Sequence, residues 1–178
     1  MPDLIRPTVL LLIVCLPVLA QGQEKVLPRV LIIGDSVYQQ PATETAKELK
    51  EQAQVVQASW GEVNIRNTTT AIEHLDRLLG YYDRKGEKLA ETDRPKWDVI
   101  HFNLGLGDLI HRAPNLKSFR VMAIHAGGVV ATDPKQYEKN LETLVRLLIQ
   151  KAPGAKIVWA STTPIRHSRE NVFKKGTE

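Results

Sequence analysis

The sequence predicts an α/β fold built on a doubly wound parallel sheet, and three observations lead to this expectation. The chain has 178 residues, of which 43% are hydrophobic and 25% charged, which suits one globular domain and excludes disordered and fibrous classes. Short apolar runs alternate with longer amphipathic stretches, and no internal repeat interrupts them. The apolar runs are nearly continuous, as in strands that helices cover on both faces.

The expected elements follow this alternation in order. Strands are expected at residues 29–33, 53–59, 97–103 and 156–162, and helices at 43–52, 68–82 and 134–151, the last opened by Pro134. A small hairpin is expected within 118–132, around Gly127-Gly128. In a doubly wound sheet these four strands take the order 2-1-3-4, and ligands bind at their carboxyl ends.

The first twenty residues read as a signal peptide rather than as part of the fold. Arg6 supplies a positive start, residues 8–20 an apolar run, and Val18-Leu19-Ala20 a cleavage site. We therefore expect a secreted or periplasmic protein, with an uncleaved anchor as the alternative. Cys15, the sole cysteine, lies in this segment. The mature chain would then have no disulfide, no cysteine nucleophile and no thiolate metal site.

Charge and histidine spacing limit the partners. The formal net charge is +4, but the basic residues alternate with acids, as in "KELKE" (47–51), and form no stripe. We expect no nucleic-acid partner and no stable membrane association after signal cleavage. No histidine pair has the helical spacing of metal ligands beside a carboxylate, so neither a metal nor another cofactor is expected.

Two strand ends carry the residues of chemical interest. "IIGDSVY" places Ser36 just past the first strand, and "WDVIHFNLGLGDL" ends the third strand in a second glycine-rich turn. With the helix and strand in "YEKNLETLVRLLIQKAPGAKIVWASTTPI", these motifs resemble the SGNH or GDSL hydrolases over residues 29–166. The resemblance implies a three-layer, flavodoxin-like domain at 28–166, followed by a polar tail at 167–178, with the family's last strand and helix missing.

The resemblance also implies a serine esterase that acts on a small-molecule or carbohydrate ester, such as acyl groups on a sugar. It makes Ser36 the nucleophile and one oxyanion donor, and it assigns Gly61 and Gly107 to the rest of the oxyanion hole. Asp35 and Asp108 would support these loops. A serine hydroxyl needs a base to take its proton, and the oxyanion needs donors already in place.

Three departures from the family's pattern put the activity in doubt. Gly61 is the only glycine in "SWGEVNIRNTTT" (59–70); Asn67 there is either a substitute donor or a helix cap, and we favour the cap. Gly107 stands where the family has an asparagine, a loss that typically costs about a hundred- to a thousand-fold in rate. No Asp-x-x-His block follows the last expected strand. We therefore expect a catalytically incomplete esterase domain, or a non-catalytic carbohydrate- or partner-binding module on the same scaffold.

The Asp-x-x-His spacing also occurs twice earlier in the chain. Asp98 and His101 lie within one strand, where alternation points them to opposite faces, so they form no pair. Asp108 and His111 lie at the carboxyl end of the sheet, which leaves His111 as an alternative base. The missing last strand would leave 156–162 as an apolar edge, through which copies of the chain could pair; a fragment of a longer product is the interpretation we favour.

Overall fold

The computed structural model describes residues 26–116 and 120–162. The expected signal peptide (1–20), the expected polar tail (167–178) and the last residues of the expected domain (163–166) lie outside the described residues. Within the two described ranges, no helix is both long and apolar enough to cross a membrane.

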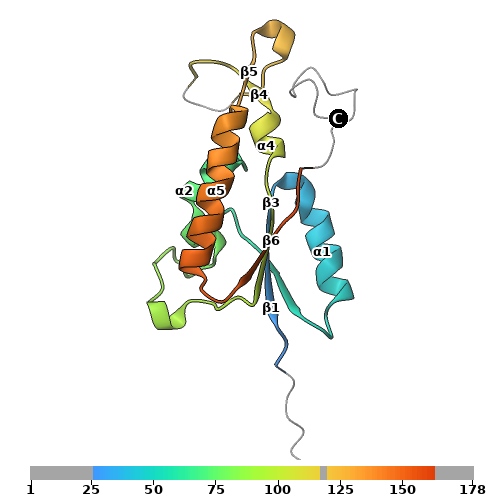
Figure 1. Cartoon of the computed structure of the whole chain (residues 1–178), viewed down its shortest axis with the longest axis vertical. Coiled ribbons are helices and arrows are strands. Elements are labelled where there is room, and N and C mark those ends of the chain that lie inside the picture. Colours follow the sequence, from blue (N-terminus) through green and yellow to red (C-terminus); the bar gives the residue numbers. More distant parts are fainter. Residues whose placement is uncertain (1–25, 117–119, 163–178) are drawn as a thin grey trace, which may run out of the picture.

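Four parallel strands form the main sheet: β1 (Arg29–Gly34), β2 (Gln54–Gln57), β3 (Val99–Asn103) and β6 (Lys156–Trp159). Their order is β2-β1-β3-β6, which confirms the predicted order and the α/β class (Figure 1). Leu31 of β1 lies opposite Val56 on β2 and Ile100 on β3. In the described part of the chain, β6 pairs with β3 alone, and pairing of copies through its other edge stays a prediction.

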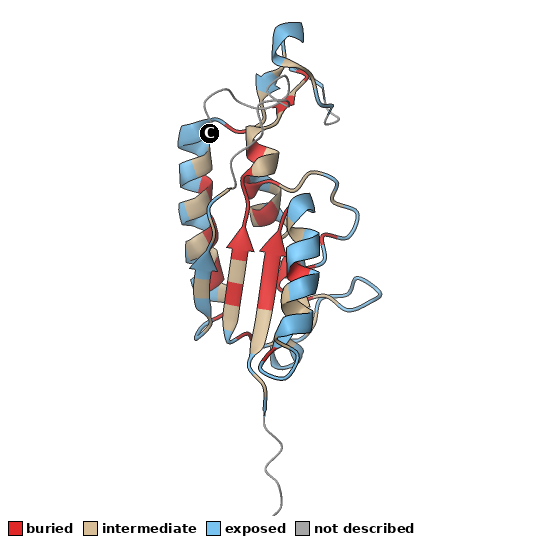
Figure 2. Ribbon diagram, turned by 90° about the vertical axis from the view of Figure 1, so that its right-hand side faces the viewer, coloured by how far each residue is buried: buried red, intermediate tan, exposed pale blue. Residues whose placement is uncertain are grey.

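Helices lie on both sides of this sheet. Figure 1 shows α1 (Gln39–Glu48) on one side, and α2 (Thr68–Glu73) and α5 (Pro134–Lys151) on the other. The short helix α3 (Leu75–Leu78) follows α2. The main core lies between the sheet and the α2, α3 and α5 side. Figure 2 shows buried residues along the central strands. The fully buried members of the core include Leu31, Ile33, Leu75, Leu78, Ile100, Phe102, Leu144 and Leu148.

The short elements gather mostly around the carboxyl ends of the strands. The 3-10 turn η1 (Ser36–Tyr38) follows β1, and helix α4 (Leu106–Leu109) follows β3. Beyond α4, β4 (His111–Arg112) pairs antiparallel with β5 (Val129–Val130), with η3 (Ile124–Ala126) between them (Figure 1). A further 3-10 turn, η2 (Glu91–Asp93), precedes β3.

Helix α5 matches its predicted bounds, and local chemistry explains why. The Asp133 side chain accepts a hydrogen bond from the Lys135 N–H, and Pro134 occupies the first turn, where its missing N–H costs nothing. Leu144 and Leu148, four residues apart, are fully buried against the sheet.

Several predicted boundaries are wrong. The strands expected at 53–59, 97–103 and 156–162 are shorter, at Gln54–Gln57, Val99–Asn103 and Lys156–Trp159, and the helix expected to reach residue 52 ends at Glu48. Helix α1 begins at Gln39 rather than at residue 43, because Pro41 falls in its first turn, where proline is tolerated. The helix predicted over 68–82 breaks at His74 and ends at Leu78, before Gly80 adopts a φ of +77°. The hairpin expected within 118–132 does turn near Gly127, but its first strand is His111–Arg112, so it spans a longer segment.

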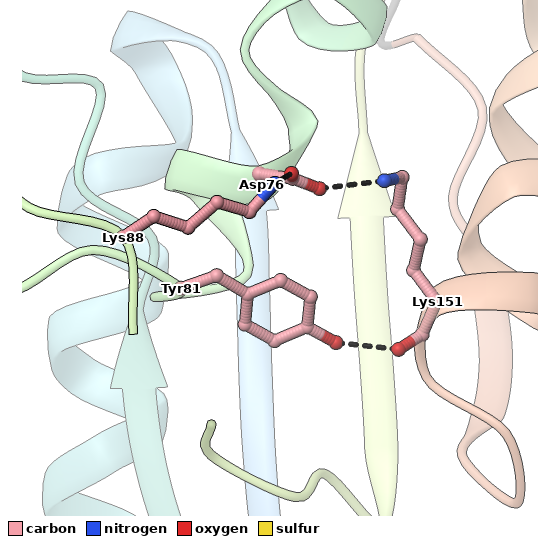
Figure 3. A network of polar contacts seen from close by, with 4 residues as sticks. All are labelled: Asp76, Tyr81, Lys88 and Lys151. Atoms are coloured by element: carbon pink, nitrogen blue, oxygen red, sulfur yellow. Dashed lines mark hydrogen bonds and ion pairs between the residues drawn. The ribbon is translucent and has the colours of Figure 1, made fainter. Parts of the chain in front are cut away.

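A polar network ties α3 to the end of α5 (Figure 3). The Asp76 carboxylate forms ion pairs with Lys88 Nζ at 2.6 Å and with Lys151 Nζ at 2.7 Å. The Tyr81 hydroxyl donates to the Lys151 backbone oxygen at 2.5 Å. Burial raises the pKa of Asp76, but the bonds from Lys151 and Lys88 outweigh burial, and the pKa lies below its ordinary value.

Candidate functional site

Ser36 is the first residue of η1 and is exposed. The turn that presents it is fixed from both sides. The Asp35 Oδ1 atom accepts a hydrogen bond from the Val37 N–H at 3.1 Å, and the Gly34 oxygen accepts one from Trp60 Nε1 at 2.8 Å. A Cβ on Gly34 would lie 2.3 Å from the Tyr38 Cβ, so only glycine fits before this turn. The Gly-Asp-Ser sequence therefore builds a tight connection that leaves the serine hydroxyl accessible.

Asp35 lies between this turn and α4. Its side chain is 2% exposed, and Oδ2 is buried with no hydrogen-bond partner among the described residues. Burial raises the pKa of Asp35; the backbone N–H groups of Val37 and Leu106 and the charge of Arg66 oppose that rise without cancelling it. Ser36 thus stands at the same end of the sheet as α4, which is the end where the parallel strands β1 and β3 both finish.

Asp108, a residue of α4, is buried and binds Thr68 at the start of α2. Its carboxylate accepts from the Thr68 N–H at 3.0 Å and from the Thr68 hydroxyl at 2.6 Å. Asn140 of α5 donates through Nδ2 to the same hydroxyl oxygen at 2.9 Å. Burial raises the pKa of Asp108, against the hydrogen bonds from Thr68 and Thr132. The Asp108 carboxylate therefore links α4 to α2 directly and to α5 through the Thr68 hydroxyl. Its oxygens accept hydrogen bonds from groups inside the fold.

Gly107 is explained by close packing. A Cβ at this position would lie 2.4 Å from the Arg66 backbone oxygen and 3.2 Å from the Asn67 Cβ. Real Cβ atoms do not approach a backbone oxygen so closely, so a side chain here would displace the segment before α2. An asparagine could not occupy position 107 in this structure without such a shift.

Asn67 is the cap of α2, which confirms the interpretation we favoured for it. Its Oδ1 accepts from the Thr70 N–H at 2.9 Å, and the Asn67 N–H donates to the Thr70 hydroxyl at 3.1 Å. This reciprocal pair is a capping box. The side chain is used in starting the helix.

Gly61 lies in the turn after Trp60 and is exposed. Its φ of +57° is the left-handed conformation that glycine adopts readily, and its N–H donates to the Ser59 hydroxyl at 3.4 Å. A Cβ there would contact the Arg77 side chain. The contacts of Gly61 are thus local, whereas those of Asp35, Gly107 and Asp108 run between η1, α2 and α4.

The histidines are spread over several elements. His111 is buried in β4, His125 is exposed in η3, and His74 lies between α2 and α3; His167 is outside the described residues. Asp98 accepts from the Arg29 N–H at 2.7 Å and is not paired with His101. Among residues 26–116 and 120–162, no cluster of three or more His, Cys, Asp or Glu side chains could hold a metal ion.

The contact between His101 and Tyr38, which lies two residues after Ser36 in η1, could not be predicted from the sequence. The Tyr38 hydroxyl lies 2.7 Å from His101 Nε2, and the two rings stack with centroids 5.5 Å apart. Burial lowers the pKa of His101, and it also raises the pKa of Tyr38, with Asp35 adding to that rise. The signal was available in β3, because a histidine between Ile100 and Phe102 must face the opposite side from both. Its partner in η1 could not be deduced from spacing.

Comparison with known proteins identifies no family for this chain. No protein-family model matches the chain, and no curated protein matches it. Among solved structures, it is similar to an acetyl xylan esterase (Est2A) from the rumen bacterium Butyrivibrio proteoclasticus, with a TM-score of 0.47 and 16% sequence identity. The match covers 78% of this chain and 48% of that one, so this chain spans about half the length of that esterase.

Proposed function

We propose that this chain carries an SGNH-type serine ester hydrolase domain with Ser36 as its nucleophile. The observation that supports the proposal best is the placement of an exposed serine directly after a buried aspartate, at the carboxyl end of the first strand and facing the α4 end of the sheet.

In the proposed reaction the Ser36 hydroxyl attacks the ester carbonyl, its proton passes to a base, and the alcohol leaves with a proton. Water then attacks the acyl-serine, releases the acid and restores the hydroxyl. The Ser36 N–H would be one oxyanion donor, and the Gly107 N–H in α4 is the candidate for a second. Gly61, with its N–H directed at Ser59, is the weakest of the three expected donors.

No residue is assigned as the general base of the proposed site. No histidine in residues 1–178 follows the last strand in the spacing that the resemblance implies. We therefore propose that the 178-residue chain by itself hydrolyses esters slowly. A non-catalytic binding module is the second candidate, and the tight packing at Gly107 favours it, because that position has no room for a side-chain donor.

We further propose a small-molecule or carbohydrate ester as the ligand, and action outside the cytoplasm after removal of residues 1–20. Exported material should begin after Ala20 by mass spectrometry of the intact protein. Exported chains that retain Met1 would contradict this location of the cleavage site.

Acylation supplies a test of the nucleophile that does not require an intrinsic base. The chain is incubated with p-nitrophenyl acetate in the presence of imidazole, which can take the serine proton, and the acetylated peptides are mapped by mass spectrometry. We expect acetyl-Ser36 and no acetyl group on Ser59, an exposed serine at the end of another strand. Equal labelling of both serines, or of neither, would contradict the proposal and favour the binding module.

A further inference from the structure

The segment between α4 and α5 forms a small ribbon whose residues are 111–113, 120–122 and 129–131. Arg112 lies opposite Val129 on one side and opposite Val121 on the other. The flanking backbone bonds run from the Met122 N–H to the His111 oxygen at 3.0 Å and from the Ala113 N–H to the Arg120 oxygen at 2.8 Å. Arg112 and Val121 therefore form a non-hydrogen-bonded pair, the kind in which opposite side chains lie closest.

The two faces of the ribbon differ. Residues directly opposite in antiparallel strands point to the same side, so Arg112, Val121 and Val129 share one face. Val121 is 45% exposed and Val129 is 43% exposed, whereas His111, the next residue on the central strand, is buried on the other face. One cation thus stands between two apolar side chains on a surface open to solvent.

The charge of this segment has one sign. Residues 109–132 contain two arginines and one lysine but no aspartate or glutamate. The flanking acids are engaged elsewhere: Asp108 is buried against Thr68, and Asp133 accepts from the Lys135 N–H at the start of α5. The exposed Arg120 adds a second cation to the ribbon, on the opposite face from Val121 because successive residues of a strand alternate. A surface of this kind attracts an anion.

We propose that the ribbon face formed by Arg112, Val121 and Val129 binds an acylated anionic polysaccharide, with a carboxylate on Arg112 and an acyl group against the valines. The inference rests on the proposed function, because it names the substrate class of the same site. The ribbon follows α4 directly and lies at the carboxyl end of the sheet (Figure 1), which is the end that presents Ser36.

An anionic lipid surface fits the ribbon less well. Interfacial anchors bury large apolar side chains several ångströms into the membrane, and tryptophan, phenylalanine and leucine are typical of them. Val121 and Val129 have short side chains and are more than half covered, so the apolar surface they offer is shallow. A surface of that depth matches an acetyl-sized group beside an anion.

Native affinity electrophoresis of the full chain tests the proposal without any need for catalysis. The gels contain polygalacturonate, acetylated polygalacturonate or neutral dextran. We expect retardation by both anionic polymers and none by dextran, with the acetylated polymer binding about fourfold more tightly, as for one buried methyl group. Replacing Arg112 by glutamine should weaken binding to both polymers about tenfold. Replacing Val121 and Val129 by serine should remove only the preference for the acetylated polymer.

Matched controls on α5 separate this face from bulk charge and exposed apolar area. Arg146→Gln removes the same unit charge from an exposed position, and Ile149→Ser removes an exposed aliphatic side chain. The proposal is overturned if Arg146→Gln weakens polymer binding as much as Arg112→Gln, or if acetylation of the polymer does not change its affinity. It is also overturned if the chain does not bind the anionic polymers and instead binds phosphatidylglycerol vesicles in an Arg112-dependent way. Acetylation of Ser36 is measured in a different experiment, so the proposed nucleophile and the proposed polysaccharide-binding face can each fail without the other.

Discussion

The Asp108 carboxylate accepts hydrogen bonds from both the backbone N–H and the hydroxyl of Thr68, although the two residues are forty positions apart. Thr68 opens α2 and Asp108 belongs to α4, so this contact fixes the start of α2 against the helix that follows β3, at the same end of the sheet as Ser36. Because both side chains are buried, neither has water as an alternative partner.

Replacing Thr68 by valine should destabilise the fold by about 1–3 kcal/mol. The substitution keeps the shape but leaves a carboxylate oxygen of Asp108 and the Asn140 amide short of a partner in the interior. Urea unfolding at neutral pH measures the change. Thr143→Val is the control, since the exposed Thr143 hydroxyl donates only to the Lys139 oxygen; it should shift stability by less than about 0.5 kcal/mol. Equal effects of the two changes would refute the role given to this contact.

Replacing Gly107 by alanine should also destabilise, by about 1–3 kcal/mol, because the new methyl group meets the Arg66 oxygen at 2.4 Å and the backbone must move. Gly107→Asn, which introduces a larger side chain at the same position, should be at least as unfavourable. Gly107 is not among the glycines with a positive φ, so the close contact alone accounts for its effect. Gly86→Ala is the comparison for backbone strain without a clash, since Gly86 has a φ of +83° and no atom within 4 Å of the added carbon. If Gly107→Asn is neutral and raises ester hydrolysis, the packing argument is wrong.

Asp76→Asn should cost about 1–2 kcal/mol at pH 7, since it leaves Lys88 and Lys151 without their shared carboxylate. The pKa of Asp76 is lowered on folding, so the folded state favours the deprotonated form. Its contribution is therefore fully present above the unfolded-state pKa of about 3.9 and is lost as the pH falls through the lower folded-state value.

The measurement is the difference in unfolding free energy between wild type and Asp76→Asn, from urea titrations at about pH 7 and at successively lower pH. The difference should shrink on acidification. Glu44→Gln serves as the reference. The side chains of Glu44 and Lys47 are 54% and 67% exposed, so their ion pair contributes little to stability at any pH. A difference for Asp76 that stays constant down to the lowest pH would contradict the assigned ion pairs.

The alternation of apolar and amphipathic segments was enough to predict the four-stranded sheet, its order and helix α5, because each depends on local pattern and on general rules of chain connection. Boundaries were less predictable. Pro41 reads as a breaker in isolation, yet it lies in the first turn of α1, and His74 interrupts a pattern that is otherwise continuous.

The candidate site shows the same division. Ser36 could be placed from its position after an apolar strand, and Asn67 from the capping preference of a polar residue before a helix. Two features required coordinates: the approach of Arg66 to Gly107, and the stacking of Tyr38 on His101, since each joins segments distant in sequence. The extent of the hairpin depended on His111 and Arg112, which carry no strand signal of their own.

The central claim, a serine site that lacks its base within residues 1–178, is tested most directly by p-nitrophenyl acetate hydrolysis by the 178-residue chain, by Ser36→Ala and by His111→Ala, without added imidazole. Most of a triad's rate is lost when its base is missing, and what remains comes from binding and the oxyanion hole. The account predicts a rate little above that of an unrelated protein, nearly unchanged in either variant. A robust activity that Ser36→Ala and His111→Ala each abolish would contradict the claim and identify His111 as a relocated base.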